Sequence, residues 1–289
     1  MPSLQHSEHA QDASSLPQSV LLVGCGKVGT RLGQQLVQTG ADVFALRRDT
    51  DSLPSTFTTL AIDLLEPIQQ TLPYVDAMVI TLTPGMQDAA GNSGYLTALQ
   101  HVAQALSSIP PRVVFVSSTR VFEGYAVDHI VTEDDPPAPG SQRGETLVEG
   151  EQLATELFDA HIVRPAGIYG PGRQMLLRKV QQHEPVQYAR RTNRIHETDL
   201  VNALHYMLTA DTPPTVLHAV DQAPATVLGD IVTHLADRLG VEPPPAIEPA
   251  ETSGKTLSGA LLTNLLGTLE YPTFVEGYDQ MLERVTHLE

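Results

Sequence analysis

The sequence predicts an α/β protein built on a doubly wound parallel sheet. A run of apolar residues at 20–23 leads directly into a Gly-x-Gly-x-x-Gly loop, and apolar side chains then recur every fourth position. Short apolar runs alternate with helical stretches as far as residue 165. This alternation is typical of parallel strands joined by right-handed crossover helices.

The glycine loop is the first candidate site. Gly24 allows the tight turn after the strand, Gly26 lets the backbone approach a pyrophosphate, and Gly29 lets the helix pack closely on the sheet. The N-terminus of the following helix offers free N–H groups and the positive end of its dipole to phosphate. An ordinary strand-to-helix turn is the structural alternative. The flanking strand and amphipathic helix favour dinucleotide binding.

Residues 41–46 predict the second strand, and Arg47 and Arg48 follow it directly. An arginine at this point of a dinucleotide-binding fold accommodates a 2′-phosphate, so the pair favours NADP, with NAD still possible. A solvated strand end is the alternative interpretation. Asp63 ends the third predicted strand, 60–64, where it either contacts adenine or forms a turn.

The remaining elements follow in order. Further strands are expected at 76–83, 112–116, 161–165 and 216–220. Helices are expected at 95–106 and 141–158, with a short one at 175–180 and another ending near residue 208. Residues 167–172 predict a loop, and the chain after residue 220 is expected to be mostly helical.

These elements predict a dinucleotide-binding domain over 19–164, rejoined near 193–220. A smaller, mostly helical substrate domain takes 165–192 and 221–289, and residues 1–18 form a disordered tail. The net charge of −17 argues against nucleic acid and anionic membranes as partners. The single cysteine, Cys25, and the scattered histidines predict no metal site. We expect a cytoplasmic monomer or homodimer with a small-molecule substrate.

Four stretches together resemble the extended and atypical short-chain dehydrogenase/reductases, which include epimerase/dehydratase-like proteins. They are the glycine loop, residues 116–122 (VSSTRVF), residues 164–172 (RPAGIYGPG) and residues 193–199 (NRIHETD). The resemblance implies a Rossmann-type fold, a nicotinamide dinucleotide, and a small polar or sugar-nucleotide substrate. It extends over nearly the whole chain after residue 18.

The resemblance also implies roles for individual residues. Ser118 matches the serine that hydrogen-bonds the substrate oxygen. Additional cofactor contacts are implied at Lys27, Val28, Leu64, Leu82, Thr83, Ser117 and Pro165. The implied substrate side comprises Thr119, Arg143, Arg194 and His196, although His196 could instead brace the following helix.

One part of the family pattern is missing. The family moves its proton through a Tyr-x-x-x-Lys pair, and alignment through Glu151 places Arg143 and Leu147 at these two positions. Arginine does not release a proton at neutral pH, and leucine carries no charge. Tyr125 and Tyr169 are the substitute candidates, each with loop packing as its alternative role. The sequence therefore leaves two functions open, an oxidoreductase with a nonstandard site and a catalytically silent NADP(H)-binding sensor.

Overall fold

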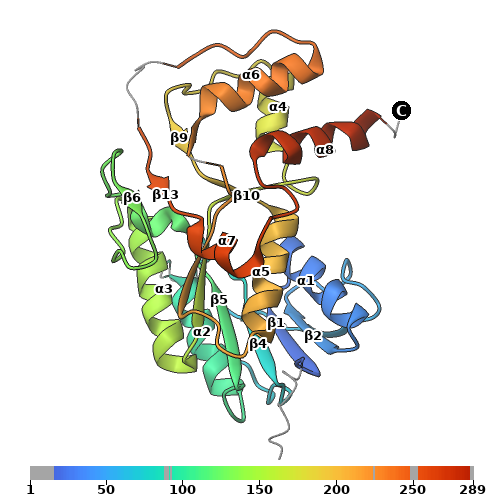
Figure 1. Cartoon of the computed structure of the whole chain (residues 1–289). Coiled ribbons are helices and arrows are strands. Elements are labelled where there is room, and N and C mark those ends of the chain that lie inside the picture. The colour runs from blue at the N-terminus through green and yellow to red at the C-terminus, as the bar shows by residue number, and fades with distance from the viewer. Residues whose placement is uncertain (1–15, 88–90, 92, 224, 248–252, 287–289) are drawn as a thin grey trace, which may run out of the picture.

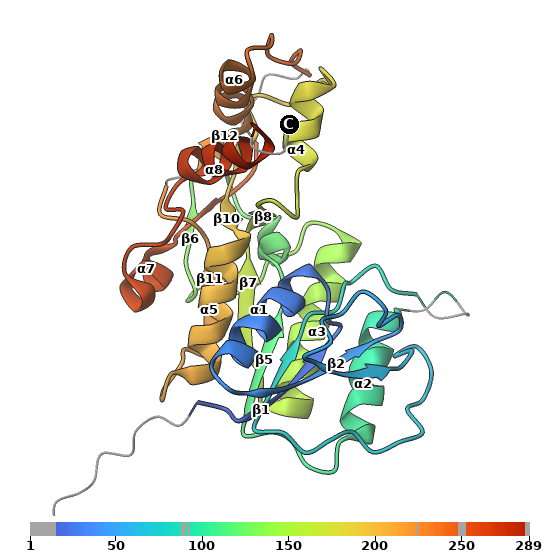
Figure 2. The same ribbon diagram turned by 90° about the vertical axis from the view of Figure 1, so that its right-hand side faces the viewer.

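The computed structural model describes residues 16–87, 91, 93–223, 225–247 and 253–286. Most of the predicted tail, 1–15, therefore lies outside the described residues. The described chain has a larger lobe around a sheet and a smaller lobe above it (Figures 1 and 2). The first strand of the sheet and the last helix of the chain lie in different lobes.

A parallel sheet of seven strands forms the centre of the larger lobe, in the order β3-β2-β1-β4-β5-β7-β11. Its strands are β1 (Ser19–Val23), β2 (Asp42–Arg47), β3 (Thr58–Ala61), β4 (Ala77–Ile80), β5 (Arg112–Val116), β7 (His161–Pro165) and β11 (Val216–Ala219). Chain order reverses direction between β1 and β4, and ligands bind at such a switch point, outside the carboxyl ends of the strands. The predicted fold class is confirmed.

Helices cover both faces of this sheet (Figure 2). On one face lie α1 (Lys27–Gln38) and α5 (Glu197–Thr209); on the other lie α2 (Gly94–Ala105) and α3 (Gln142–Phe158). Val28, Leu32 and Leu36 of α1 are all buried, as their four-residue spacing predicts. The central strands β1 and β4 are apolar except for Ser19 at the start of β1, because they are covered on both sides.

The smaller lobe packs α4 (Met175–Gln181), α6 (Leu228–Leu239) and α8 (Phe274–Thr286) around a separate apolar core. A further helix, α7 (Ala260–Leu266), packs against α5 and β11. Short two-stranded pairs lie outside the seven-stranded sheet. They are β8 (Gly167–Tyr169) with β10 (Arg194–His196), β9 (Arg191–Thr192) with β12 (Thr226–Val227), and β6 (Ile130–Val131) with β13 (Thr256–Leu257).

Two sequence predictions need correction here. The third strand lies at Thr58–Ala61 and not at 60–64. Within the described part of the chain it is an edge strand paired only with β2, and the Asp63 carboxylate ends it by accepting a hydrogen bond from the Leu65 N–H at 3.1 Å. The predicted loop 167–172 contains β8, whose partner β10 follows much later in the chain. Local pattern gives no sign of such a pairing.

Candidate functional site

The glycine loop lies between β1 and α1, at the point where the strand order of the sheet reverses. Gly24 has a φ of +77°, and a Cβ there would lie 2.8 Å from the Leu82 side chain, so glycine is required by the fold itself. Gly26 caps α1 with an extended backbone and no side-chain cap. A Cβ at Gly26 would meet only the Gly24 carbonyl oxygen, at 3.8 Å. The surface above Gly26 is therefore open, which fits a pyrophosphate group.

A small cavity of about 290 Å³ adjoins this loop. Arg47 lies in it and donates a hydrogen bond from Nη1 to Ser52 Oγ at 3.3 Å. Arg48 is 77% exposed and lies 3.9 Å from Asp63. Of the predicted pair, Arg47 therefore lines this small cavity and Arg48 does not. Leu64 is buried, and its carbonyl oxygen accepts a hydrogen bond from His101.

Glu197, which the sequence analysis did not select, joins the glycine helix to the loop after β8. Its buried carboxylate accepts a hydrogen bond from the Gly172 N–H at 2.9 Å and pairs with Arg31 at 3.0 Å. Lys27 Nζ donates to the Gly172 carbonyl oxygen. Gly170 has to be glycine, since its φ is +143° and a Cβ would clash with Glu197. This network closes one side of the candidate cofactor site.

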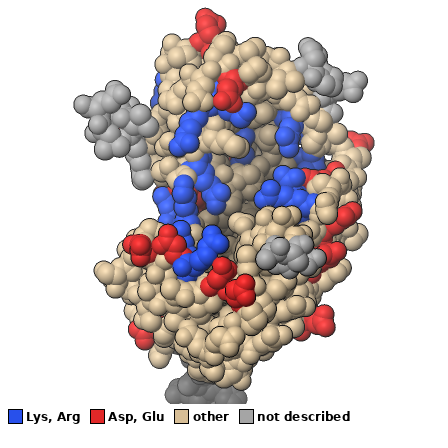
Figure 3. All heavy atoms as spheres, turned by 180° about the vertical axis from the view of Figure 1, so that it is seen from behind, with Lys and Arg blue, Asp and Glu red and all other residues tan. Residues whose placement is uncertain are grey.

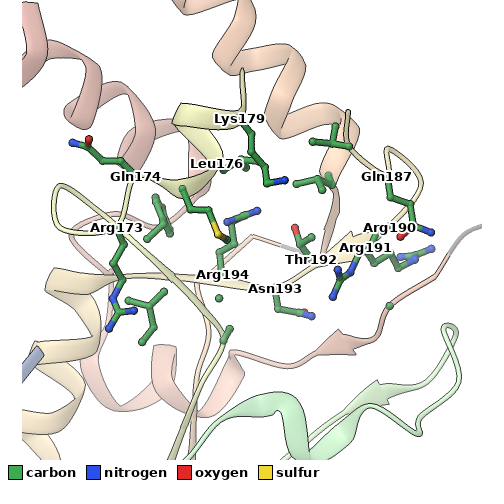
Figure 4. Close-up of a pocket in the computed structure, with 18 of the residues that line it drawn as sticks. Arg173, Gln174, Leu176, Lys179, Gln187, Arg190, Arg191, Thr192, Asn193 and Arg194 are labelled. Atoms are coloured by element: carbon green, nitrogen blue, oxygen red, sulfur yellow. The ribbon is translucent and has the colours of Figure 1, made fainter. Parts of the chain in front are cut away.

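A large cavity of about 1090 Å³ lies between the two lobes; we call it the cleft. Lys and Arg side chains gather around the hollow in the space-filling view (Figure 3). Nine of the 17 Lys and Arg residues of this acidic chain line it, against two acidic residues. The nine are Lys27, Arg120, Arg173, Arg178, Lys179, Arg190, Arg191, Arg194 and Lys255. In Figure 4, Lys179 from α4 and Arg194 from β10 extend toward the same space.

Ser118 and Thr119 form part of the cleft wall, at the carboxyl end of β5. Ser118 Oγ accepts a hydrogen bond from the Arg120 N–H at 3.2 Å and thereby caps the short 3₁₀ helix η1 (Thr119–Phe122). Because this Oγ acts as an acceptor there, its hydroxyl proton is available for a ligand. Ser117 is buried, and its Oγ has no hydrogen-bond partner among the described residues.

The remaining predicted cofactor contacts lie around the same edge of the sheet. Pro165 is the buried last residue of β7, and its neighbour Ala166 lines the cleft. Leu82 and Thr83 follow β4, half-buried and exposed respectively. Val28 is buried in α1 and packs in the core. The structure thus places Pro165, Leu82 and Thr83 at the carboxyl ends of β7 and β4. Val28 packs in the core of the larger lobe.

The two candidate tyrosines are held by backbone carbonyls. The Tyr125 hydroxyl donates to the Pro136 carbonyl oxygen at 2.8 Å, and Tyr125 is not among the residues that line the cleft. Tyr169 lines the cleft, but it is 1% exposed and its hydroxyl donates to the Thr273 carbonyl oxygen at 3.1 Å. Burial raises the pKa of Tyr169 further above its ordinary value. Neither hydroxyl is placed to exchange protons with a ligand in the cleft.

Of the implied substrate residues, Arg194 lies in the cleft and donates from Nη1 to the Tyr278 hydroxyl at 3.2 Å. Arg143 is exposed on α3 outside the cleft, and Leu147, at the position of the family's lysine, is buried in the core. His196 is not among the residues that line the cleft, and its contacts fit the alternative role of bracing the following helix. His196 is 1% exposed and caps α5 by accepting a hydrogen bond from the Thr198 N–H at 3.3 Å.

Residues 18–194 match the model of the RmlD substrate binding domain family. The chain belongs to this family. It is 29% identical to protein YeeZ of Escherichia coli strain K12 over 278 residues, covering 88% of this chain and 96% of YeeZ. The resemblance predicted from the four sequence motifs, to epimerase/dehydratase-like short-chain dehydrogenase/reductases, is therefore confirmed.

Solved structures agree with this family assignment. One from Methylobacillus flagellatus, named as an NAD-dependent epimerase/dehydratase, superposes with a TM-score of 0.78 at 28% identity over 94% of this chain and 100% of its own. MoeE5 in complex with UDP-glucuronic acid and NAD gives a TM-score of 0.70 at 22% identity, over 94% of this chain and 100% of MoeE5. The latter similarity concerns the fold alone.

Two further findings bear on this member of the RmlD substrate binding domain family. Within the described ranges, no helix has the length and apolarity needed to cross a membrane. In the same ranges, no three His, Cys, Asp or Glu side chains are grouped as metal ligands would be.

Proposed function

We propose that this protein is an NAD(P)-dependent, epimerase/dehydratase-like oxidoreductase whose substrate is a sugar nucleotide. The observation that carries the proposal is the concentration of nine Lys and Arg residues in one cleft of a chain with net charge −17. Lys27 belongs to both the glycine loop and the cleft wall, so the two candidate sites are continuous.

The chemistry of the cleft suits a diphosphate. Arginine presents planar pairs of N–H donors that match phosphate oxygens. Six of the nine cleft cations are arginines, and the other three are Lys27, Lys179 and Lys255. Arg194 is held by the hydroxyl of Tyr278 and lies over its ring, with Cζ 5.9 Å from the ring centroid. A side chain fixed in this way loses little rotational freedom when it binds an anion.

We further propose NADPH as the preferred dinucleotide. Arg47 and Ser52 line the small cavity beside Gly26, where a 2′-phosphate would follow the adenosine ribose. When bound, the dinucleotide would supply hydride exchange at its nicotinamide. Gly26, Lys27, Thr30 and Arg47 would hold its phosphates, and Ser118 would donate a hydrogen bond to the substrate oxygen.

A second candidate function is a silent NADP(H)-binding sensor. One observation favours it: the positions of the family's tyrosine and lysine hold an exposed Arg143 and a buried Leu147. Such a protein would bind dinucleotide without turnover. The two functions therefore differ in one measurable property, which is the conversion of a bound sugar nucleotide.

The test is a panel of UDP- and dTDP-linked hexoses and uronic acids, incubated with protein and NADPH or NADP⁺ and followed by NMR. We expect conversion of at least one sugar, and calorimetric binding that weakens at least tenfold in Arg194→Ala. Arg238→Ala is the matched control, because Arg238 lies on α6 outside the cleft. Dinucleotide binding without conversion of any sugar would favour the sensor. Equal sugar-nucleotide binding by both variants would refute the assignment of the cleft.

A further inference from the structure

Lys255 is a cleft residue whose backbone is fixed on both sides. The Asn193 side chain donates from Nδ2 to the Lys255 carbonyl oxygen and accepts from the Leu257 N–H through Oδ1, both at 2.9 Å. Immediately after Lys255, β13 pairs with β6 in the larger lobe. These contacts fix the segment that carries Lys255 to Asn193 and to β6 of the larger lobe, so the position of Lys255 is set by the fold.

The charged groups facing the Lys255 amine are Arg120 and Glu123 from the η1 segment and Arg190 from the segment before β9. Glu123 is already engaged, since it pairs with Arg120 at 2.5 Å and accepts a hydrogen bond from Ser141. Among the described residues, no acceptor lies within hydrogen-bonding distance of Lys255 Nζ. Partial burial lowers the pKa of Lys255 to about 8; Glu123 opposes this shift and the two arginines add to it.

Lys255 shares this wall with the residues that would orient a substrate hydroxyl. Ser118, Thr119 and Lys255 all line the same cavity, and Ser118 has a free hydroxyl proton. The amine also faces Glu123, which accepts a hydrogen bond from Ser141, the N-cap of the helix that should carry the family's tyrosine. Lys255 therefore brings an amine that can exchange protons to the cavity that Ser118 lines, although Lys255 comes from a different part of the chain than the helix that begins after Ser141.

We propose that Lys255 is the proton-transfer residue of this cleft and takes over the role that the missing tyrosine has in related enzymes. The proposal rests on the proposed function. In the oxidation direction, a bound oxidised dinucleotide would supply the hydride acceptor for the hydrogen of the substrate C–H bond and its electron pair. The O–H proton passes to the neutral Nζ of Lys255, and a carbonyl forms. The ammonium returns the proton to oxygen when hydride returns to carbon.

The first experiment measures the proton affinity of Lys255 without any turnover. The chain contains three lysines, Lys27, Lys179 and Lys255, so acetic anhydride labelling from pH 6 to 11 with peptide mass spectrometry resolves each of them. We expect labelling of Lys255 to reach half its maximum near pH 8 in the folded protein, with or without NADPH. In urea-unfolded protein the midpoint should shift to about 10.4. Equal midpoints in folded and unfolded protein would overturn the proposal.

The second experiment compares Lys255→Arg with wild type on the sugar nucleotide that wild type converts. Arginine keeps the charge but does not release a proton, so sugar-nucleotide binding should change less than threefold while kcat falls about 100-fold or more. The wild-type kcat for oxidation should rise through pH 8, and the variant should lack this rise. Undiminished kcat in Lys255→Arg would overturn the proton-transfer role of Lys255 and leave the proposed enzyme function intact. Absence of turnover in wild type over the whole panel would overturn the proposed enzyme function, and with it this role.

Discussion

Gly26→Ala provides the sharpest test of the dinucleotide site, because the structure separates its effect on binding from its effect on folding. A Cβ at Gly26 would have its nearest neighbour at 3.8 Å, an ordinary contact distance, and the Gly26 backbone is extended. The methyl group would instead enter the space open to the pyrophosphate. Folding should therefore be preserved while binding is lost.

In Gly26→Ala, folding stability is expected to rise slightly while dinucleotide affinity falls. Replacing a glycine at a compatible backbone position stabilises the folded state by about 0.4–1 kcal/mol through the unfolded chain. Displacing the pyrophosphate removes backbone N–H bonds to an anion, each worth about 1.5–3 kcal/mol. The loss of two such bonds weakens binding roughly 100- to 10,000-fold. Gly24→Ala is the contrasting variant, since its φ of +77° and the 2.8 Å approach to Leu82 should reduce stability directly.

The assay is isothermal titration calorimetry with NADPH and NADH, accompanied by thermal unfolding of each variant. We expect Gly26→Ala to melt at or slightly above the wild-type temperature and to show no measurable dinucleotide binding. Gly26→Val should behave likewise in binding. Wild-type affinity in a folded Gly26→Ala protein would refute the assignment of the glycine loop as a pyrophosphate site.

Three further predictions follow from named contacts. Arg47→Ala should reduce the preference for NADPH over NADH at least tenfold by calorimetry, since a charge-assisted bond is worth about 1.5–3 kcal/mol; Arg48→Ala should act more weakly because Arg48 is 77% exposed, and the reverse order would contradict the role of the small cavity. Glu197→Ala removes the acceptor of the Gly172 N–H and should lower the free energy of unfolding by about 1–3 kcal/mol in urea denaturation; unchanged stability would show that this network is dispensable. Burial raises the pKa of Asp221 to about 8, so the folded chain retains a proton that the unfolded chain releases above about pH 4, and stability is lost as the pH rises toward 8. Asp221→Asn should therefore flatten the fall in stability between pH 5 and pH 8, and an identical fall in both proteins would place the titration elsewhere.

The sequence by itself determined the parts of this protein whose cause is local. An apolar run followed at once by glycines and an amphipathic helix is typical of a strand–turn–helix unit, so β1, the glycine loop and α1 were predicted at the positions where the structure has them. The end of β5 and the position of Ser118 followed in the same way. The absence of the family's tyrosine and lysine was also visible without coordinates.

Tertiary structure decided which polar residues share the cleft. Arginines and lysines outside the helices and strands follow no periodicity, because neither helix nor strand formation constrains them, so Arg173 and Lys255 carried no signal in the sequence. Lys255 lines the same cavity as Ser118 although the two residues lie far apart in the chain, and the pairing of β13 with the distant β6 holds the segment next to Lys255 in place. For His196 the sequence left two roles open, a ligand contact and bracing of the following helix, and the structure shows its ring capping the start of α5. The local pattern set the backbone scaffold, whereas long-range packing set the composition of the site.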